Sequence, residues 1–240
     1  MDSKQDFKYK SNIFVVPFLF IVTIWFVYFV EIKYGLNFNK FGIYPRHLKG
    51  LIGVFLSPFI HSNIEHLMNN SVPLYVLSIS LLYFYDDSKT KVLVLGGLLS
   101  GLLTWCFGRE SYHIGASGIV YLLFSFIFFS GIIKRHYRLI AMSLITIFLY
   151  GSMVWYVFPI DADISWEGHL SGFVVGMVLA YVYRKKGIVL EKHEFVKTDF
   201  DDMFDEHGNY VPPVLDEVKK EEVIKLPVKY KYVYKSSEEE

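Results

Sequence analysis

Cysteine is almost absent from this chain of 240 residues, in which Cys106 stands alone. A lone cysteine cannot form an internal disulfide, and without a CxxC partner it does not indicate a metal or redox site. Its apolar neighbours favour a packing role in a helix. An excess of charge is absent too, because 24 Lys and Arg residues balance 24 Asp and Glu residues. Since no basic stripe with interleaved aromatic residues occurs either, the sequence argues against a nucleic-acid-binding protein.

Signatures of metal binding and of ion conduction are also missing. The chain has no HExxH motif, and Glu65 directly precedes His66, which is the wrong order for that motif. We therefore expect no metal and no cofactor. No Asp or Glu lies deep in a long apolar segment and no inverted repeat is visible, which argues against a channel or a transporter.

Apolar residues are what the chain has in excess. They make up 53% of it, and the mean hydropathy is +0.34, whereas an ordinary soluble domain has about 45–50% apolar residues. Nearly all of the excess lies between residues 12 and 184, while residues 187–240 hold 14 acidic and 8 basic residues. The composition predicts one membrane domain, residues 1–186, and a polar tail, residues 187–240, with a composition typical of disorder.

Six apolar segments approach the roughly 20 residues that a membrane-spanning helix needs. The first lacks a small-residue cleavage site, so we expect a retained helix and not a cleaved signal peptide. The fourth is short, because 17 residues from Ser117 to Ile133 cover about 26 Å of a ~30 Å hydrocarbon core. Such a helix can begin below the surface, beside protein or a wet cavity. The predicted spans are residues 12–32, 62–85, 91–108, 116–133, 138–159 and 167–184.

Lysine and arginine near the spans predict their orientation, because cytoplasmic loops are enriched in these residues. Basic residues flank the N-terminus, the loops at 86–90 and 134–137, and the end of the last span, whereas the loop before the last span has only acidic ones. Four residues of the first outer loop run against the rule: Lys33, Lys40, Arg46 and Lys49. We predict that both termini are cytoplasmic and that the second, fourth and sixth spans begin on the opposite side.

The fourth span opens with Gly115-Ala116-Ser117-Gly118. Glycine permits a tight entry turn, and the start of a helix leaves backbone N–H groups free to hold an oxyanion. Ser117 is therefore a candidate nucleophile. A small-residue motif that serves only helix packing is the alternative interpretation.

The sixth span opens with His169, and ionisable residues inside membranes are usually functional. Gly168, Gly172 and Gly176 recur every four residues and form a smooth face that lets a neighbouring helix approach closely. Since His169 borders this face, it could come within hydrogen-bonding reach of Ser117 and act as its base. A histidine that only faces water at the interface is the alternative.

The second span begins with a third polar cluster. Ser62-x-x-Glu65 reads as a capping box, which predicts that the helix starts at Ser62. His66 and Asn70 then lie one turn apart on one face, where their side chains could donate hydrogen bonds to an oxyanion. His61 precedes the cap and is expected to support the loop.

Tyr121 lies four residues after Ser117, one turn deeper on the same face. Its ring could stack on His169 and orient it, a role that a carboxylate plays in catalytic triads. Because no carboxylate lies deep in a span, a serine hydrolase built on these residues would use a Ser–His dyad.

These motifs, in this order across six spans, resemble those of the rhomboid family of intramembrane serine proteases. The resemblance covers about residues 12–184 and implies an all-α membrane protein, a six-transmembrane-helix rhomboid-like bundle with a polar C-terminal tail. The chain departs from the family pattern in two places. It has Gly168 where many members have alanine, and Tyr44-Pro45-Arg46 in the first outer loop where many have a Trp-Arg pair.

The resemblance also implies roles for individual residues. Ser117 would be the nucleophile and His169 the general base, with Tyr121 as the ring beneath the histidine. The oxyanion site would consist of His66, Asn70 and the Ser117 N–H. The supporting residues would be His61, Gly115, Gly118 and Gly172.

The activity implied is that of an intramembrane serine endopeptidase that cleaves transmembrane segments of membrane proteins. It would reside in a bacterial cytoplasmic membrane, with the lipid bilayer and membrane-protein substrates as its partners. The alternative is a catalytically silent rhomboid-like protein that binds or escorts membrane proteins; loss of the serine or the histidine would mark that class, and both are present. The sequence carries no signal for the oligomeric state.

Overall fold

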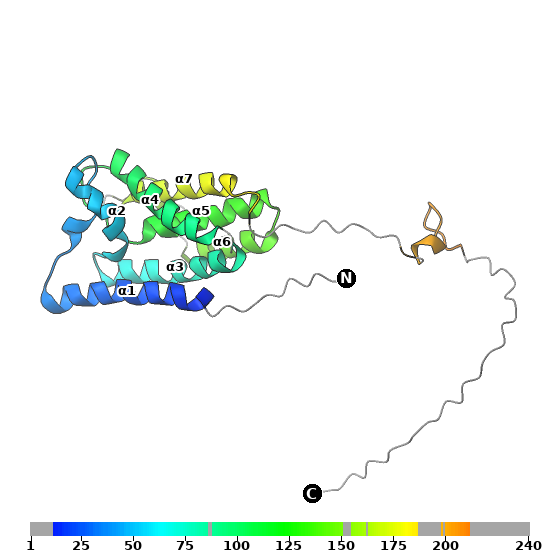
Figure 1. Cartoon of the computed structure of the whole chain (residues 1–240), viewed down its shortest axis with the longest axis horizontal. Helices are drawn as coiled ribbons and strands as arrows, with labels where there is room; N and C mark the ends of the chain where they lie inside the picture. Colours follow the sequence, from blue (N-terminus) through cyan, green and yellow to red (C-terminus); the bar gives the residue numbers. More distant parts are fainter. Residues whose placement is uncertain are drawn as a thin grey trace, which may run out of the picture. The chain divides into compact units, whose positions relative to one another are not determined.

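The computed structural model describes residues 12–85, 88–150, 155–161, 163–186, 198 and 200–211. Throughout these residues the regular elements are helices, and strand-like pairing is limited to two isolated bridges, Ile43 with His113 and Phe204 with Tyr210 (Figure 1). The all-α prediction is therefore confirmed for this part of the chain. The predicted cytoplasmic N-terminus, residues 86–87 of one predicted loop, residues 151–154 of the predicted fifth span and most of the predicted tail lie outside it.

Six helices of 14 residues or more lie at the positions of the six apolar segments. Three of them, α1, α3 and α4, are long and apolar enough to cross a membrane. The predicted fifth span is too long, because residues 155–157 form a separate 3₁₀ turn. The six are α1 (Asn12–Tyr34), α3 (Ile64–Phe84), α4 (Lys89–Phe107), α5 (Ser117–Ile133), α6 (Tyr137–Tyr150) and α7 (Trp166–Val182); the short α2 (Gly53–Leu56) and three 3₁₀ turns lie between α1 and α3.

Helix α5 forms the centre of the helical bundle. It contacts α3, α4, α6 and α7, and most of its side chains are buried. A helix that is apolar on all sides is either buried in protein or faces lipid, and the contacts with four other helices show that this one is buried. Its short length also means that its first residue, Ser117, lies inside the bundle and is only 8% exposed.

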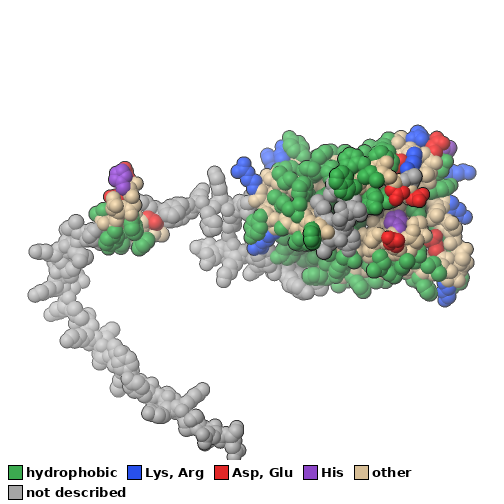
Figure 2. Space-filling model, turned by 180° about the vertical axis from the view of Figure 1, so that it is seen from behind, with side chains coloured by type: hydrophobic (Ala, Val, Ile, Leu, Met, Phe, Trp, Pro, Cys, Tyr) green, Lys and Arg blue, Asp and Glu red, His purple; other side chains and the backbone are tan. Residues whose placement is uncertain are grey.

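Helix α1 shows the opposite pattern and packs mainly against α3. Only Pro17, Ile24 and Glu31 are buried in it, while large apolar side chains are exposed along its length. Figure 2 shows apolar side chains covering much of one face of the bundle. An apolar surface of this extent is typical of a protein that meets lipid.

Glycines bring α7 into backbone contact with α5. A Cβ atom added at Gly172 would overlap the carbonyl oxygen of Gly118, and one added at Gly176 would overlap that of Leu122. The smooth face predicted for α7 is thus confirmed at two of its three glycines. At Gly168 a Cβ would meet the Ser165 hydroxyl, which belongs to the start of α7 itself.

The start of α3 differs by one residue from the prediction. Asn63, not Ser62, is the N-cap, and its side-chain oxygen accepts the N–H of His66 at 2.7 Å. Asn and Ser cap helices about equally well, so the motif alone could not decide between two adjacent candidates. The Ser62 hydroxyl instead lies 3.3 Å from Nδ1 of His66.

The chain divides into two units, residues 1–191 and 192–240. Within the second unit, the described residues include a 3₁₀ turn at Asp201–Met203. A tight loop follows, in which the Asp205 carboxylate accepts the backbone N–H groups of His207 and Asn209. The domain boundary at residue 186 and the cytoplasmic location of the tail stay predictions.

The glycine contacts between α5 and α7 predict the effect of a single methyl group. Gly176→Ala should destabilise the protein by about 1–3 kcal/mol, the usual cost of overpacking a filled site, because the new Cβ meets backbone that cannot move aside. Thermal unfolding in detergent measures this change. Gly97→Ala is the matched control, since it adds the same group to helix α4 where nothing lies within 4 Å. Equal melting temperatures for the two variants would contradict the close helix contact.

Candidate active site

A cleft of about 1180 Å³ lies at the ends of α3, α5 and α7. All five residues predicted to form the catalytic centre line it: His66, Asn70, Ser117, Tyr121 and His169. Since these residues come from three helices that are far apart in the sequence, the fold gathers them in one place.

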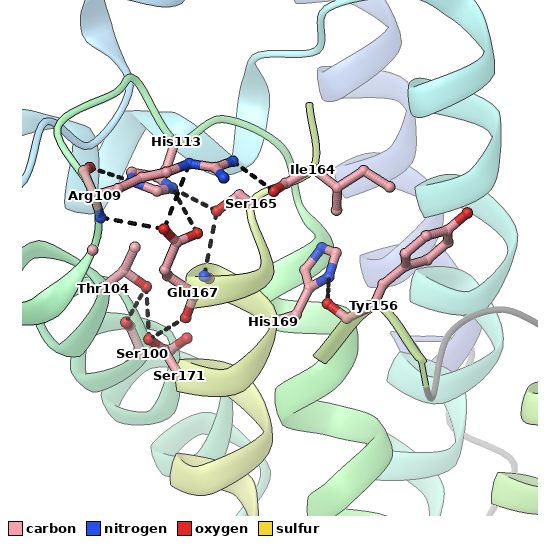
Figure 3. Close-up of polar contacts among 12 residues, drawn as sticks. Ser100, Thr104, Arg109, His113, Tyr156, Ile164, Ser165, Glu167, His169 and Ser171 are labelled. Atoms are coloured by element: carbon pink, nitrogen blue, oxygen red, sulfur yellow. Dashed lines mark hydrogen bonds and ion pairs between the residues drawn. The ribbon is translucent and has the colours of Figure 1, made fainter. Parts of the chain in front are cut away.

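His169 is held by a backbone group that the sequence did not reveal. It is 6% exposed, and its Nδ1 lies 2.8 Å from the carbonyl oxygen of Tyr156 (Figure 3). A carbonyl can only accept a hydrogen bond, so Nδ1 must carry the proton. In a neutral imidazole the other nitrogen, Nε2, then has a free lone pair. The contact with Tyr156 therefore leaves Nε2 as a proton acceptor.

The ring of Tyr121 lies flat against the ring of His169. Their centroids are 4.3 Å apart and the planes are inclined by 15°. The stacking suggested by the position of Tyr121 one turn after Ser117 is therefore observed. Together with the Tyr156 carbonyl, it restricts both the tilt and the rotation of the imidazole.

The turn that leads into α5 is held in an unusual backbone conformation. Gly115 has a φ of +105°, which L-residues with a side chain rarely adopt. Its N–H donates to the carbonyl of Ser57 at 2.9 Å. This turn places Ser117 at the first position of the helix, where backbone N–H groups have no partner within the helix.

The side chains of His66 and Asn70 lie against this turn. A Cβ atom added at Gly115 would lie 2.6 Å from Nε2 of His66 and 3.5 Å from the amide nitrogen of Asn70. Within the described residues that amide nitrogen is buried and has no hydrogen-bond acceptor. A buried donor without an acceptor, aimed at the entry to the serine helix, is what an oxyanion would satisfy.

His61 also contacts this turn. It is 2% exposed, and its Nε2 accepts the N–H of Ala116 at 3.5 Å. Burial and, to a smaller extent, the nearby His66 lower the pKa of His61 to about 3. His61 is therefore neutral at physiological pH and able to accept this N–H, which agrees with the supporting role expected of it.

A cluster that the sequence did not predict forms part of the cleft wall, because Arg109, His113 and Ser165 line the cleft. It consists of Arg109 and His113, from the loop before Ser117, and Ser165 and Glu167, from the start of α7 (Figure 3). Glu167, the first residue of the predicted sixth span, is 1% exposed in the first turn of α7. No role was assigned to His113, which is 3% exposed; burial lowers its pKa. The feature of the sequence that could have pointed to Glu167 is its position next to Gly168 and His169.

The first outer loop also has contacts that its sequence left open. The guanidinium of Arg46 donates to the carbonyl of Gly108 at 2.7 Å, and its backbone N–H donates to the carbonyl of Trp105 at 3.0 Å. The loop is thereby fastened to the end of α4, next to the residues that lead to Ser117.

The comparison with known families agrees with this arrangement. Residues 48–186, more than half of the chain, match the Rhomboid domain. The chain belongs to the rhomboid family. Proteins of Mycobacterium tuberculosis and Mycobacterium bovis are each 31% identical to it over 172 residues, which is 68% of this chain and 72% of the relative. A protein of Mycobacterium leprae is 29% identical over 142 residues, 55% of this chain and 56% of that protein. All three relatives are named only as uncharacterized proteins.

The surroundings of Gly115 and Gly118 predict that an added methyl group destabilises the protein at the first position and has little effect at the second. Gly115→Ala should lower the melting temperature, because a positive φ costs a side-chain-bearing residue about 1–3 kcal/mol and the new Cβ would meet His66 at 2.6 Å. Gly118→Ala should change it little, since its nearest neighbours lie at an ordinary 3.5 Å. Thermal unfolding of both variants in the same detergent tests this order, and the reverse order would show that the turn is not held as described.

Proposed function

We propose that this rhomboid protein is an intramembrane serine endopeptidase that works with a Ser117–His169 dyad. One observation carries the proposal. The Tyr156 carbonyl occupies Nδ1 of His169 at 2.8 Å and so leaves Nε2 as a base, inside the cleft that Ser117 also lines. A serine hydroxyl is a weak nucleophile until such a base removes its proton.

In the proposed reaction the Ser117 oxygen attacks the carbonyl carbon of the scissile peptide bond while its proton passes to Nε2 of His169. The tetrahedral oxyanion accepts hydrogen bonds from the Ser117 N–H, the Asn70 amide and His66. When the Ser62 hydroxyl donates to Nδ1 of His66 across 3.3 Å, Nε2 of His66 carries a proton and can donate into the cleft. His169 then gives its proton to the leaving amine. In the second half of the reaction His169 takes a proton from a water molecule, which attacks the acyl carbon, and returns the proton to the Ser117 oxygen as the acid leaves.

The substrates we propose are membrane proteins with a transmembrane helix that is easily unwound near its outer end. A helix hides its carbonyl groups in internal hydrogen bonds, so a peptide must be extended before its carbonyl can reach Ser117. Glycine or proline near that end would ease the unwinding, because both disfavour the helix. No metal or cofactor takes part in this scheme.

The dyad can be tested by covalent labelling. A fluorophosphonate should attach to Ser117 in the purified protein, because the reagent needs an activated serine. Labelling should vanish in Ser117→Ala and fall steeply in His169→Ala, with both variants folded as judged by thermal unfolding. Asn70→Ala should be labelled more slowly and lose about 10²–10³ in turnover, the usual loss for one oxyanion donor.

Two results would argue against this assignment. Labelling of His169→Ala at the wild-type rate would exclude His169 as the base. A folded wild type that is neither labelled nor able to cleave a model rhomboid substrate would favour the alternative, a catalytically silent protein that binds or escorts membrane proteins.

We also propose that the cleft opens on the non-cytoplasmic side, as the distribution of Lys and Arg predicts. In a Cys106→Ser background, which removes the exposed native cysteine, Asp163→Cys should react with an impermeant maleimide added to intact cells. Tyr137→Cys, at the first residue of α6, should react only after the membrane is opened. Both positions are exposed, so burial does not confuse the result. The opposite pattern would reverse the orientation.

A further inference from the structure

The Arg109–His113–Ser165–Glu167 cluster joins the two segments that carry the proposed dyad. Arg109 and His113 belong to the loop that runs into Gly115 and Ser117. Ser165 and Glu167 are the N-cap and the second residue of α7, which carries His169 at its fourth position. The cluster is therefore a polar connection between the serine and the histidine segments.

Glu167 is the charged centre of this cluster. Its Oε1 accepts the backbone N–H of Arg109 at 3.2 Å and lies 3.5 Å from Nε of the same residue. Its Oε2 lies 3.9 Å from Nδ1 of His113 and has no hydrogen-bond partner among the described residues. Arg109 reaches back to α7 in turn, because its guanidinium donates to the carbonyl of Ile164 at 2.7 Å. The loop and the helix thus hold each other through both backbone and side chains.

His113 extends the connection to the first turn of α7. Its Nε2 lies 3.0 Å from the carbonyl of Arg109, so Nε2 carries the proton and Nδ1 accepts. The partner of Nδ1 is the Ser165 hydroxyl at 2.6 Å. The same hydroxyl oxygen accepts the N–H of Gly168 at 3.3 Å and so caps the start of α7. Gly168 directly precedes His169.

The other side of this helical turn is fixed to α4. The Ser171 hydroxyl donates to the backbone carbonyl of Glu167 at 2.6 Å and accepts a hydrogen bond from Thr104 at 2.9 Å (Figure 3). Because Glu167 is anchored through its backbone as well, its carboxylate is a fixed point against which the loop is held.

We propose that Glu167 is a positioning residue, which sets the distance between Ser117 and His169 by holding the 109–114 loop on the start of α7. The inference rests on the proposed function, since it concerns the geometry of that dyad. Loops are more mobile than the elements that they join, and a displacement of about 1 Å can cost roughly 10²-fold in rate. A buried carboxylate that binds a backbone N–H resists such a displacement.

The test compares two substitutions of Glu167 with two controls. Glu167→Leu removes the acceptor, while Glu167→Gln keeps an amide oxygen that can still accept the Arg109 N–H. Glu110→Gln lies on the same loop, where the side chain is 61% exposed. Glu31→Gln changes another buried carboxylate, on α1, which accepts the N–H of Phe38 and lies outside the cleft.

Three quantities are measured for each variant: kcat and KM on a model transmembrane substrate, the rate of fluorophosphonate labelling, and hydrogen exchange of the backbone amides. Glu167→Leu should lose about 10- to 100-fold in kcat, with KM unchanged and labelling slowed in parallel. Glu167→Gln should lose less. Exchange should rise in residues 109–118 and 163–170 of the Glu167 variants and in neither segment of the two controls.

Each outcome has a distinct meaning. Wild-type kcat and labelling in Glu167→Leu would overturn the inference, and so would an increase in exchange spread over all helices, which would indicate a purely structural role. An inert wild type would remove the proposed function instead. In that case, faster hydrogen exchange confined to residues 109–118 and 163–170 of the Glu167 variants would still support the placement of the loop by Glu167. Unchanged exchange in these two segments would overturn the inference.

Discussion

Backbone contact between α5 and α7 is the constraint on which the rest of the structure depends. Gly172 and Gly176 leave no side chain between the two helices, so α7 lies directly on the carbonyl groups of Gly118 and Leu122. Ser117 begins one of these helices and His169 lies in the first turns of the other. A single methyl group at the contact would separate the helices and with them the two side chains. The packing of α5 against α7 therefore also sets the relative position of Ser117 and His169 in the cleft.

A polar cleft at this position requires every buried polar group to find a partner, because water is scarce near lipid. The partners are largely backbone groups: the Tyr156 carbonyl for His169, and the Ala116 N–H for His61. Such contacts also decide which imidazole nitrogen carries the proton. Three buried polar atoms around the cleft have no hydrogen-bond partner among the described residues: the amide nitrogen of Asn70, Nδ1 of His61 and Oε2 of Glu167. The Asn70 nitrogen is informative because it lies beside Gly115, at the entry to the serine helix, where the proposed reaction would create a negative charge.

Much of this could be predicted from the sequence, and the parts that could not share a physical cause. Hydrophobic segments located all six long helices, and the four-residue spacing of Ser117 and Tyr121 anticipated the stacked ring on His169. The contact between the Tyr156 carbonyl and His169 could not be predicted, because every residue has a backbone carbonyl group and the sequence does not distinguish this one from the others. The burial of Glu167 could not be predicted for a related reason: an acidic residue at the end of a span is as compatible with a solvated position as with a buried one. Here the neighbouring loop folds over it.

The position of Glu167 explains how a buried carboxylate can lie so close to the proposed base without serving as the third member of a triad. Residues two apart on a helix do not face each other, so Glu167 points toward the loop while His169 points into the cleft (Figure 3). In a triad, the carboxylate would orient the imidazole and stabilise its protonated form. The neutral Tyr156 carbonyl can orient it but offers less stabilisation to an imidazolium. The proposed dyad therefore relies on fixed geometry more than on charge at the base, and the carboxylate contributes by holding that geometry.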